Sequence, residues 1–241
     1  MAQPTPEDIA QICQRFLLRL KDPTIQPKPQ FAIFIGGFPN SGKTTVAREL
    51  IDSWALNAVH VQANDARVLL TEMGGFSWGE NVRTIIRAVL EKLFADGHSV
   101  ILDGAFIEDG EQSIRREFIK KYDLKTLLVA VTCSVETATE RARKRYMDGK
   151  ASSFGDWRAN DIEELIGSMP ERKERLERLL DHDRSVKVID NDDSAPQESW
   201  EYVEEIWADF SKSLKYPTGP DGPVFYFHGT IRHDGCYSSN S

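Results

Sequence analysis

The residues best suited to chemistry form a glycine-rich segment that reads Gly37-x-x-x-x-Gly42-Lys43-Thr44. A chain that wraps phosphates closely needs glycines, because a Cβ would collide with the ligand or block the turn. Backbone N–H groups at a helix N-terminus then point at the negative charge, Lys43 reaches the β- and γ-phosphates, and the Thr44 hydroxyl ligates Mg²⁺. The segment therefore predicts a Walker A phosphate-binding loop (P-loop) for ATP or GTP. The predicted nucleotide-binding residues are Gly37, Phe38, Pro39, Asn40, Ser41, Gly42, Lys43, Thr44 and Thr45.

A carboxylate is expected near this loop, because Asp103 comes directly after a continuous apolar run, residues 100–102. Ligands of open α/β sheets gather at the carboxyl ends of the strands. A bound Mg²⁺ also needs an anionic partner. We expect Asp103 to serve the metal together with Thr44, as a Walker B acid does. The alternative is an aspartate that only caps the strand end at the Gly104 turn.

Two further polar residues, Asp65 and Arg67, follow a second short apolar run, residues 58–61. Such an aspartate can accept a proton from an attacking hydroxyl, and the arginine can hold an anionic group of the substrate. Alternatively, the carboxylate caps a helix and the arginine lies on the surface.

A basic stretch contains Arg141 and Arg145, which share one helical face because they are four residues apart. A polar loop, residues 147–156, follows them. This arrangement fits a lid that closes over the triphosphate and neutralises charge during transfer. A run of charges on an ordinary solvated helix face is the alternative.

Strand and helix patterns alternate around these residues. Apolar runs predict strands at 31–35, 58–61, 100–102, 127–131 and 186–189. Apolar residues at helical spacing predict helices at 6–20, 43–54, 81–95, 112–122, 135–146 and 197–214, together with a charged helical stretch interrupted at Pro170. The pattern predicts an α/β fold, a three-layer P-loop NTPase with a mostly parallel five-stranded sheet and a helical lid.

The chain divides into three parts along its length. Residues 1–30 are expected to form a helix and a Pro-rich linker, residues 31–215 the P-loop domain with a lid at about 141–160, and residues 216–241 a Pro- and Gly-rich tail. The tail fits either an added edge strand or a partly ordered segment.

The bulk composition limits the function. A net charge of −8 argues against a broad surface for nucleic acid. Three distant cysteines suggest reduced thiols, and the five histidines lack the spacing of a zinc site. No apolar run is long enough to span a membrane, and we expect a cytoplasmic protein without membrane partners. The sequence leaves the oligomeric state open.

Together, these residues resemble the P-loop kinases that include the 5′-kinase domain of phage-type polynucleotide kinase and the zeta toxins. The resemblance covers roughly residues 31–193, and rests on the P-loop, residues 64–67, residues 102–106 and the Arg141-x-x-x-Arg145 pair. It implies that Asp65 is the general base, that Arg67 binds a phosphate of the acceptor, and that the two lid arginines contact the donor phosphates. There is one departure. Such kinases space the base and the arginine as D-x-x-R, and here Asn64 occupies the expected aspartate position.

The sequence thus predicts a phosphotransferase that uses ATP and Mg²⁺ to phosphorylate a hydroxyl of a small acceptor, such as a nucleoside or a nucleotide-sugar. The predicted catalytic residues are Lys43, Asp65, Arg67, Arg141 and Arg145. The alternatives are a zeta-toxin-like nucleotide-sugar kinase, a polynucleotide 5′-kinase, and a regulatory nucleotide-binding module without catalysis, which Asn64 favours. A regulatory GTPase is disfavoured, because no N-K-x-D guanine signature follows the fourth strand. A long nucleic acid is not the expected partner.

Overall fold

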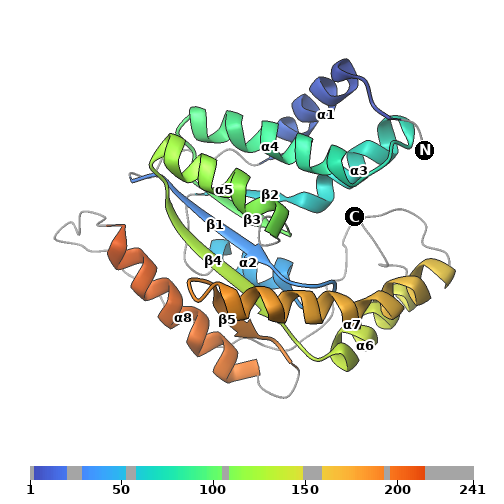
Figure 1. The fold of residues 1–241 in the computed structure, drawn as a ribbon, viewed down its shortest axis with the longest axis vertical. Coiled ribbons are helices and arrows are strands. Elements are labelled where there is room, and N and C mark those ends of the chain that lie inside the picture. The colour runs from blue at the N-terminus through green and yellow to red at the C-terminus, as the bar shows by residue number, and fades with distance from the viewer. Residues whose placement is uncertain are drawn as a thin grey trace, which may run out of the picture.

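Five parallel strands form the centre of the computed structural model (Figure 1). They are β1 (Phe31–Gly36), β2 (Val59–Gln62), β3 (Val100–Asp103), β4 (Lys125–Thr132) and β5 (Lys187–Asp190), in the order β2-β3-β1-β4-β5. Each neighbouring pair is parallel, and Asp103 lies in register with both Ile35 of β1 and Gln62 of β2. The carboxyl ends of β1, β2 and β3 therefore meet at one edge of the sheet.

The structure describes residues 3–20, 29–52, 58–104, 109–148, 159–192 and 196–214. The predicted 216–241 tail lies outside these ranges, as do residues 149–158 of the predicted lid and residues 105 and 106. No helix within the described ranges is long and apolar enough to cross a membrane.

Helices cover both faces of the sheet, as Figure 1 shows. One face packs against α1 (Pro6–Arg19), α3 (Ala63–Gly74), α4 (Glu80–Ala95), α5 (Asp109–Tyr122), α6 (Val135–Met147) and α7 (Ala159–His182). The other packs against α2 (Lys43–Asp52) and α8 (Pro196–Ser213). This arrangement confirms the predicted three-layer α/β fold with a parallel five-stranded sheet.

The first helix belongs to the main core. Ile12 and Phe16 of α1 are fully buried among the residues of α3 and α4, which α1 contacts. Thr5 caps this helix by accepting a hydrogen bond from the backbone N–H of Asp8, whose carboxylate accepts from the N–H of Thr5 in return. The N-terminal segment therefore contributes buried apolar surface to the domain and also fixes the outer face of α3.

Two elements differ from the sequence prediction. Helix α3 begins at Ala63, directly after β2, where the sequence suggested only a strand end at residues 64 and 65. Helix α7 continues through Pro170, although an interruption was predicted there. Met169 next to this proline is fully buried, and Leu176 and Leu179 on the following turns are also buried. Their packing outweighs the cost of about 3 kcal/mol that a proline imposes on a helix interior.

Candidate active site at the carboxyl edge of the sheet

The P-loop joins the end of β1 to the start of α2, and its glycines are required by close packing. Gly37 and Gly42 have φ values of 144° and 98°. A Cβ on Gly37 would lie 2.2 Å from the carbonyl oxygen of Val131, and one on Gly42 would lie 2.0 Å from Nδ2 of Asn191. Both positions thus exclude a side chain even before a nucleotide enters.

Lys43 is the point on which the charges of the site converge. Its Nζ donates a hydrogen bond of 2.7 Å to the carbonyl oxygen of Phe38 in the same loop. Burial lowers the pKa of Lys43 to about 8; the carboxylate of Asp103 opposes this change, and the positive charges of Arg67 and Arg145 add to it. Three of the predicted site residues, from β3, α3 and α6, therefore act electrostatically on the lysine of the P-loop.

The lowered pKa of Lys43 gives a pH-dependent prediction for the nucleotide-free protein. Below about pH 8 the lysine is protonated in both the folded and the unfolded state, so the full cost of burying the charge weakens the fold. Between about pH 8 and the ordinary value of 10.5, the unfolded state binds more protons, and stability therefore rises with pH. We expect Lys43→Met to be more stable than the wild type at pH 7, with an advantage that shrinks across this window.

Urea unfolding of the two proteins at several pH values measures this difference, since the other titrating groups are common to both. A constant difference between pH 7 and pH 10 would contradict a lowered pKa for Lys43.

Asp103 and Thr44 form the pair that was predicted to serve the metal. The Thr44 hydroxyl donates a hydrogen bond of 2.6 Å to Oδ2 of Asp103, and the aspartate is only 5% exposed. His60 of β2 lies close behind, with its Nε2 3.9 Å from the same carboxylate oxygen. One hydroxyl and one carboxylate, beside a loop shaped for phosphates, match the hard oxygen ligands of Mg²⁺, which takes its other ligands from water and phosphate. These two residues therefore fit the predicted cofactor.

The first turn of α3 lies beside the end of β3, because a Cβ on Gly104 would be only 3.7 Å from that of Ala63. Asn64 and Arg67 are three residues apart and share one side of this helix, and it is Arg67 that acts on Lys43. Asp65 is rotated from Asn64 by about 100° around the helix axis. Arg67 is thus the residue of this turn whose charge reaches the lysine of the P-loop.

Asp65 lies instead on the side of α3 that carries Glu72, seven residues further on. Glu72 accepts a hydrogen bond of 2.7 Å from Arg19 at the end of α1. Burial raises the pKa of Asp65, the charge of Arg19 opposes this, and Asp103 raises the pKa further. The general-base role of Asp65 stays a prediction, with both Arg19 and Asp103 as its electrostatic neighbours.

Arg141 and Arg145 of α6 contact the P-loop itself. Arg141 donates to the carbonyl oxygen of Asn191 at 2.8 Å and to that of Asn40 at 3.5 Å, while Arg145 donates to the side-chain oxygen of Asn40 at 3.1 Å. The two lid arginines are therefore held against the loop by hydrogen bonds to Asn40. Their contact with donor phosphates stays a prediction.

Sequence reasoning missed the residues after β5 that hold this arrangement together. The side chain of Asn191 donates to the carbonyl oxygen of Ser41 at 2.9 Å, so one residue links the P-loop to Arg141. The carboxylate of Asp192 accepts from both the backbone N–H and the hydroxyl of Ser134, the N-cap of α6. Polar residues directly after a strand were the signal that identified Asp103, and the same criterion finds Asn191 and Asp192.

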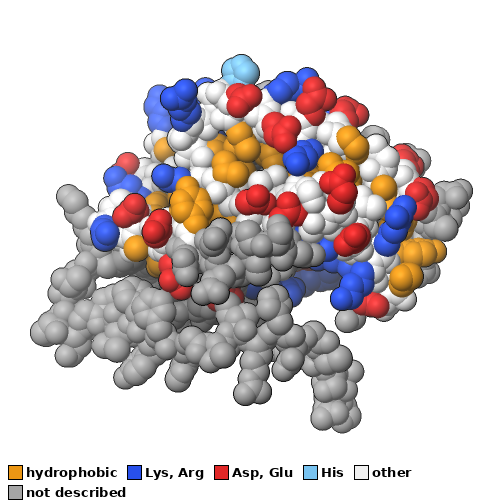
Figure 2. All heavy atoms as spheres, turned by 90° about the horizontal axis from the view of Figure 1, so that it is seen from below, with side chains coloured by type: hydrophobic (Ala, Val, Ile, Leu, Met, Phe, Trp, Pro, Cys, Tyr) orange, Lys and Arg blue, Asp and Glu red, His pale blue; other side chains and the backbone are white. Residues whose placement is uncertain are grey.

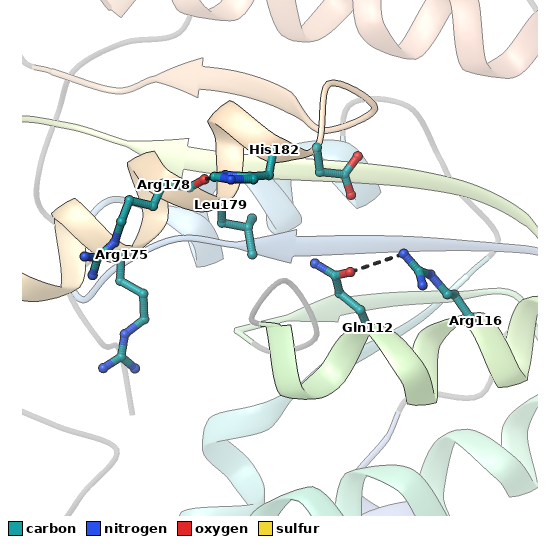
Figure 3. Close-up of a pocket in the computed structure, with 7 residues that line it drawn as sticks. Gln112, Arg116, Arg175, Arg178, Leu179 and His182 are labelled. Carbon is teal, nitrogen blue, oxygen red and sulfur yellow. Dashed lines mark hydrogen bonds between the residues drawn. The ribbon is translucent and has the colours of Figure 1, made fainter.

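A separate cavity of 690 Å³ lies between α5 and α7 (Figure 3). Among the described residues that line it, none is a predicted site residue. Most of them are basic or polar, and those labelled in Figure 3 are Gln112, Arg116, Arg175, Arg178, Leu179 and His182. Two of its arginines already pair with glutamates one turn earlier on α7, at 3.4 Å each.

Comparisons with known proteins show which proteins share the sequence pattern and the fold of this chain. A UPF0200 protein of Hyperthermus butylicus is 27% identical over 146 residues, which are 55% of this chain and 75% of the relative. A structure from the PezAT chromosomal toxin–antitoxin system of Streptococcus pneumoniae covers 90% of this chain and 100% of its own, at 14% identity and a TM-score of 0.59. Kti12 of Chaetomium thermophilum, in complex with ADP-AlF3, covers 73% of this chain and 97% of its own, at 19% identity and a TM-score of 0.50.

The family assignment rests on a sequence profile. The profile described as an AAA domain matches residues 33–161, which are more than half of the 241 residues. The matched stretch includes the P-loop, Asp103, the first turn of α3 and both arginines of α6. The chain therefore belongs to this AAA domain family, and its fold is shared by solved structures of P-loop kinases.

Proposed function

We propose that the protein is an ATP-dependent phosphotransferase that moves the γ-phosphoryl group to a hydroxyl of a compact acceptor. The observation that carries this proposal is the assembly at one sheet edge of Lys43, the hydrogen-bonded Thr44 and Asp103, and Arg145, which bonds to Asn40 of the loop. Arg67 of α3 is close enough to act on Lys43 as well. A nucleotide-binding loop alone needs only the lysine and the backbone N–H groups. Arg67 comes from α3, which begins at the carboxyl end of β2. An additional arginine at this place suits an enzyme, which must also hold a second, anionic reactant.

The residues divide the work of the reaction between them. Lys43 and the N–H groups of the P-loop hold the donor phosphates, and Arg141 and Arg145 fix the loop through Asn40 and neutralise charge from the side of α6. Thr44 and Asp103 would hold Mg²⁺, which would supply positive charge to neutralise the phosphates of the donor. Catalysis then consists mainly of positioning and charge neutralisation.

The surface charge supports a compact acceptor. The net charge is −8, and on the face in Figure 2 acidic and basic side chains are interspersed rather than gathered in a field of one sign. A long polyanion would be repelled by such a protein outside the active site. A nucleoside, a nucleotide-sugar or another small hydroxyl compound avoids this repulsion, whereas a polynucleotide would need its terminal nucleotide alone to enter.

One observation favours the rival function, a nucleotide-binding module without catalysis. The arginines of α6 bond to Asn40 of the loop and to Asn191, and contacts that hold the loop in this way also suit a protein that only senses the nucleotide. Transfer of labelled phosphate from γ-labelled ATP to a panel of nucleosides, sugars, their phosphates and 5′-OH oligonucleotides decides between them. Tight ATP binding with no transfer to any of these compounds would favour the module.

Arg67→Ala gives a specific test of the acceptor side. We expect the KM for the acceptor to rise about tenfold while the KM for ATP stays within about twofold, because Arg67 would bind the acceptor's anionic group. Arg67→Lys should recover part of the loss, since it keeps the charge but not the fork of donors.

The matched control is Arg143→Ala, which removes an exposed arginine of α6 whose partner, Glu163, is also on the surface. An Arg67→Ala enzyme that loses ATP affinity instead of acceptor affinity would place Arg67 on the donor side.

A further inference from the structure

The cavity between α5 and α7 has a lining that the proposed phosphotransfer does not use (Figure 3). Its volume of 690 Å³ lies within the range of about 300–1,000 Å³ that is usual for small-molecule sites. Such sites are mostly apolar, whereas Leu179 is the one apolar residue among the described residues of this lining. The others are polar or charged, namely Gln112, Arg116, Arg175, Arg178, His182 and Asp183. The cavity therefore suits a charged ligand.

The charges of the described lining are mainly positive, because it contains three arginines and one carboxylate, that of Asp183. This carboxylate already has partners within the protein. It accepts a hydrogen bond of 3.1 Å from the backbone N–H of Ser185, and its Oδ2 lies 3.6 Å from Nη2 of Arg115. A local excess of positive charge in a chain with a net charge of −8 points to an anionic ligand.

Arg115 adds a buried positive charge next to this lining. The residue is only 4% exposed, and its ion pair with Asp183 joins α5 to the residue that follows α7. Burial lowers the pKa of Arg115, the charge of Asp183 opposes this change, and the neighbouring charge of Arg116 adds to it. One carboxylate cannot offset the charges of both arginines, and an anion held in the cavity would supply the second negative charge.

The ion pairs that Arg175 and Arg178 form along α7 leave room for a ligand. Each arginine lies 3.4 Å from a glutamate one turn earlier, Glu171 and Glu174 respectively, and all four side chains are more than half exposed. Exposed pairs of this kind contribute little to stability. Both arginines can therefore turn toward a ligand at small cost.

The cavity is separate from the P-loop. Helix α7 ends at His182 shortly before β5 begins at Lys187, so its last turn lies toward the amino edge of the parallel sheet. The P-loop follows β1 at the carboxyl edge. An anion bound beside the last turns of α7 is therefore a different ligand from the nucleotide that Lys43 holds.

We propose that this cavity is a second anion site, which binds a compact molecule that carries two phosphate groups. Arginine suits such a ligand, because its planar fork of N–H donors pairs with two phosphate oxygens at once. Arg116 comes from α5, whereas Arg175 and Arg178 come from α7, and Figure 3 shows the two helices on either side of the cavity. One phosphate group binds on each side, so the ligand connects the two helices.

The experiment measures binding to the full chain by isothermal titration calorimetry, with the P-loop occupied by Mg²⁺ and the non-hydrolysable β,γ-imido analogue of ATP. The probes are two compounds whose phosphate groups are spaced differently, fructose 1,6-bisphosphate and 2,3-bisphosphoglycerate. Each is compared with its monophosphate, fructose 6-phosphate or 3-phosphoglycerate. We expect one site for at least one bisphosphate, and binding of its monophosphate that is at least about tenfold weaker.

Arg116→Ala and Arg178→Ala test the two sides of the cavity separately. Each change should weaken binding of the bisphosphate at least about tenfold, and the double variant should not bind it. Arg172→Ala is the matched control, because Arg172 is an exposed arginine of α7 that donates to the Ser168 hydroxyl and is not among the described residues of the lining. The replaced side chains are exposed, so the ligand-free variants should unfold at nearly the Tm of the wild type.

A second measurement follows the ligand through its effect on stability. The bisphosphate should raise the Tm of the wild type and of Arg172→Ala, because it binds only the folded chain, and should leave the Tm of the double variant unchanged. An equal loss of binding in Arg172→Ala would overturn the proposal, since it would show a general attraction to the charges of α7.

Two further results would also overturn the proposal. One is the absence of binding of both bisphosphates with a Kd below about 1 mM while the P-loop is occupied. The other is an RNA oligonucleotide that displaces the bisphosphate and binds more tightly through Arg116 and Arg178, which would make the cavity part of a nucleic-acid surface. Because the P-loop is occupied throughout, none of these results depends on the proposed phosphotransferase function.

Discussion

Lys43→Ala is expected to abolish measurable phosphoryl transfer and to weaken ATP binding by at least about 100-fold. The variant lacks the positive charge of the loop that lies nearest to the bound phosphates. The phosphates then contact only backbone N–H groups and the arginines of α6. A 100-fold loss corresponds to about 2.7 kcal/mol of binding free energy. Fluorescence titration with a labelled ATP analogue measures the affinity.

The fold should survive this change. The ammonium group of Lys43 contacts the carbonyl oxygen of Phe38 rather than the apolar core. Circular dichroism and thermal unfolding should therefore match those of the wild type or show a modest gain in stability. The control, Lys120→Ala, removes an exposed lysine of α5 and should leave affinity unchanged. Undiminished ATP affinity in Lys43→Ala would contradict the assignment of the P-loop.

Asp103→Asn should impair the use of Mg²⁺ while leaving the binding of the nucleotide itself nearly unchanged. The amide keeps an oxygen that can accept the hydrogen bond from Thr44, so the change removes a charge with little change in shape. We expect kcat to fall at least about 100-fold, because Mg²⁺ loses its anionic partner, while ATP binding in the absence of Mg²⁺ changes little. The pKa of Lys43 should also fall further, since Asp103 makes the larger of the contributions that oppose its lowering.

The measurement is ATP binding and turnover across a Mg²⁺ titration. Asp96→Asn is the matched control, because Asp96 is an exposed partner of Lys92 at the end of α4. If the Asp103 variant keeps the turnover and the Mg²⁺ dependence of the wild type, the aspartate only caps the strand end, as the alternative interpretation of the sequence held.

The P-loop and the core elements could be predicted from the sequence because local signals agree there. The glycines of residues 37–42 stand between an apolar run and a helical pattern, and helix α4 was predicted within one residue of its observed bounds, Glu80–Ala95. Asp103 could be found because it directly follows a buried strand, at the sheet edge where ligands of open α/β sheets bind.

The first turn of α3 could not be predicted in the same way. The sequence shows a strand that stops near Asn64, and the choice between Asn64 and Asp65 depends on where the next helix starts. That start is set by tertiary packing: Ala63, Ala66 and Leu70 are buried against the main core. Their burial fixes the rotation of α3 and so decides that Asn64, and not Asp65, lies on the side of Arg67. A one-residue difference in a helix start changes the direction of every side chain by about 100°.

The contacts of Arg141 and Asn191 were also out of reach of the sequence, because they join residues 50 positions apart. Neither residue carries a local signal for the other. Only the parallel pairing of β4 with β5 brings the start of α6 next to the end of β5.

The bonds from α6 to the loop have a mechanical consequence. Ser134 at the start of α6 is hydrogen-bonded to Asp192. Arg141 is hydrogen-bonded to Asn191, and Arg145 to Asn40. These hydrogen bonds hold the first three turns of α6 at the sheet edge, so this part of the helix cannot rotate away from the sheet without breaking them. A closing movement that keeps these hydrogen bonds would therefore have to begin after Arg145 in the chain.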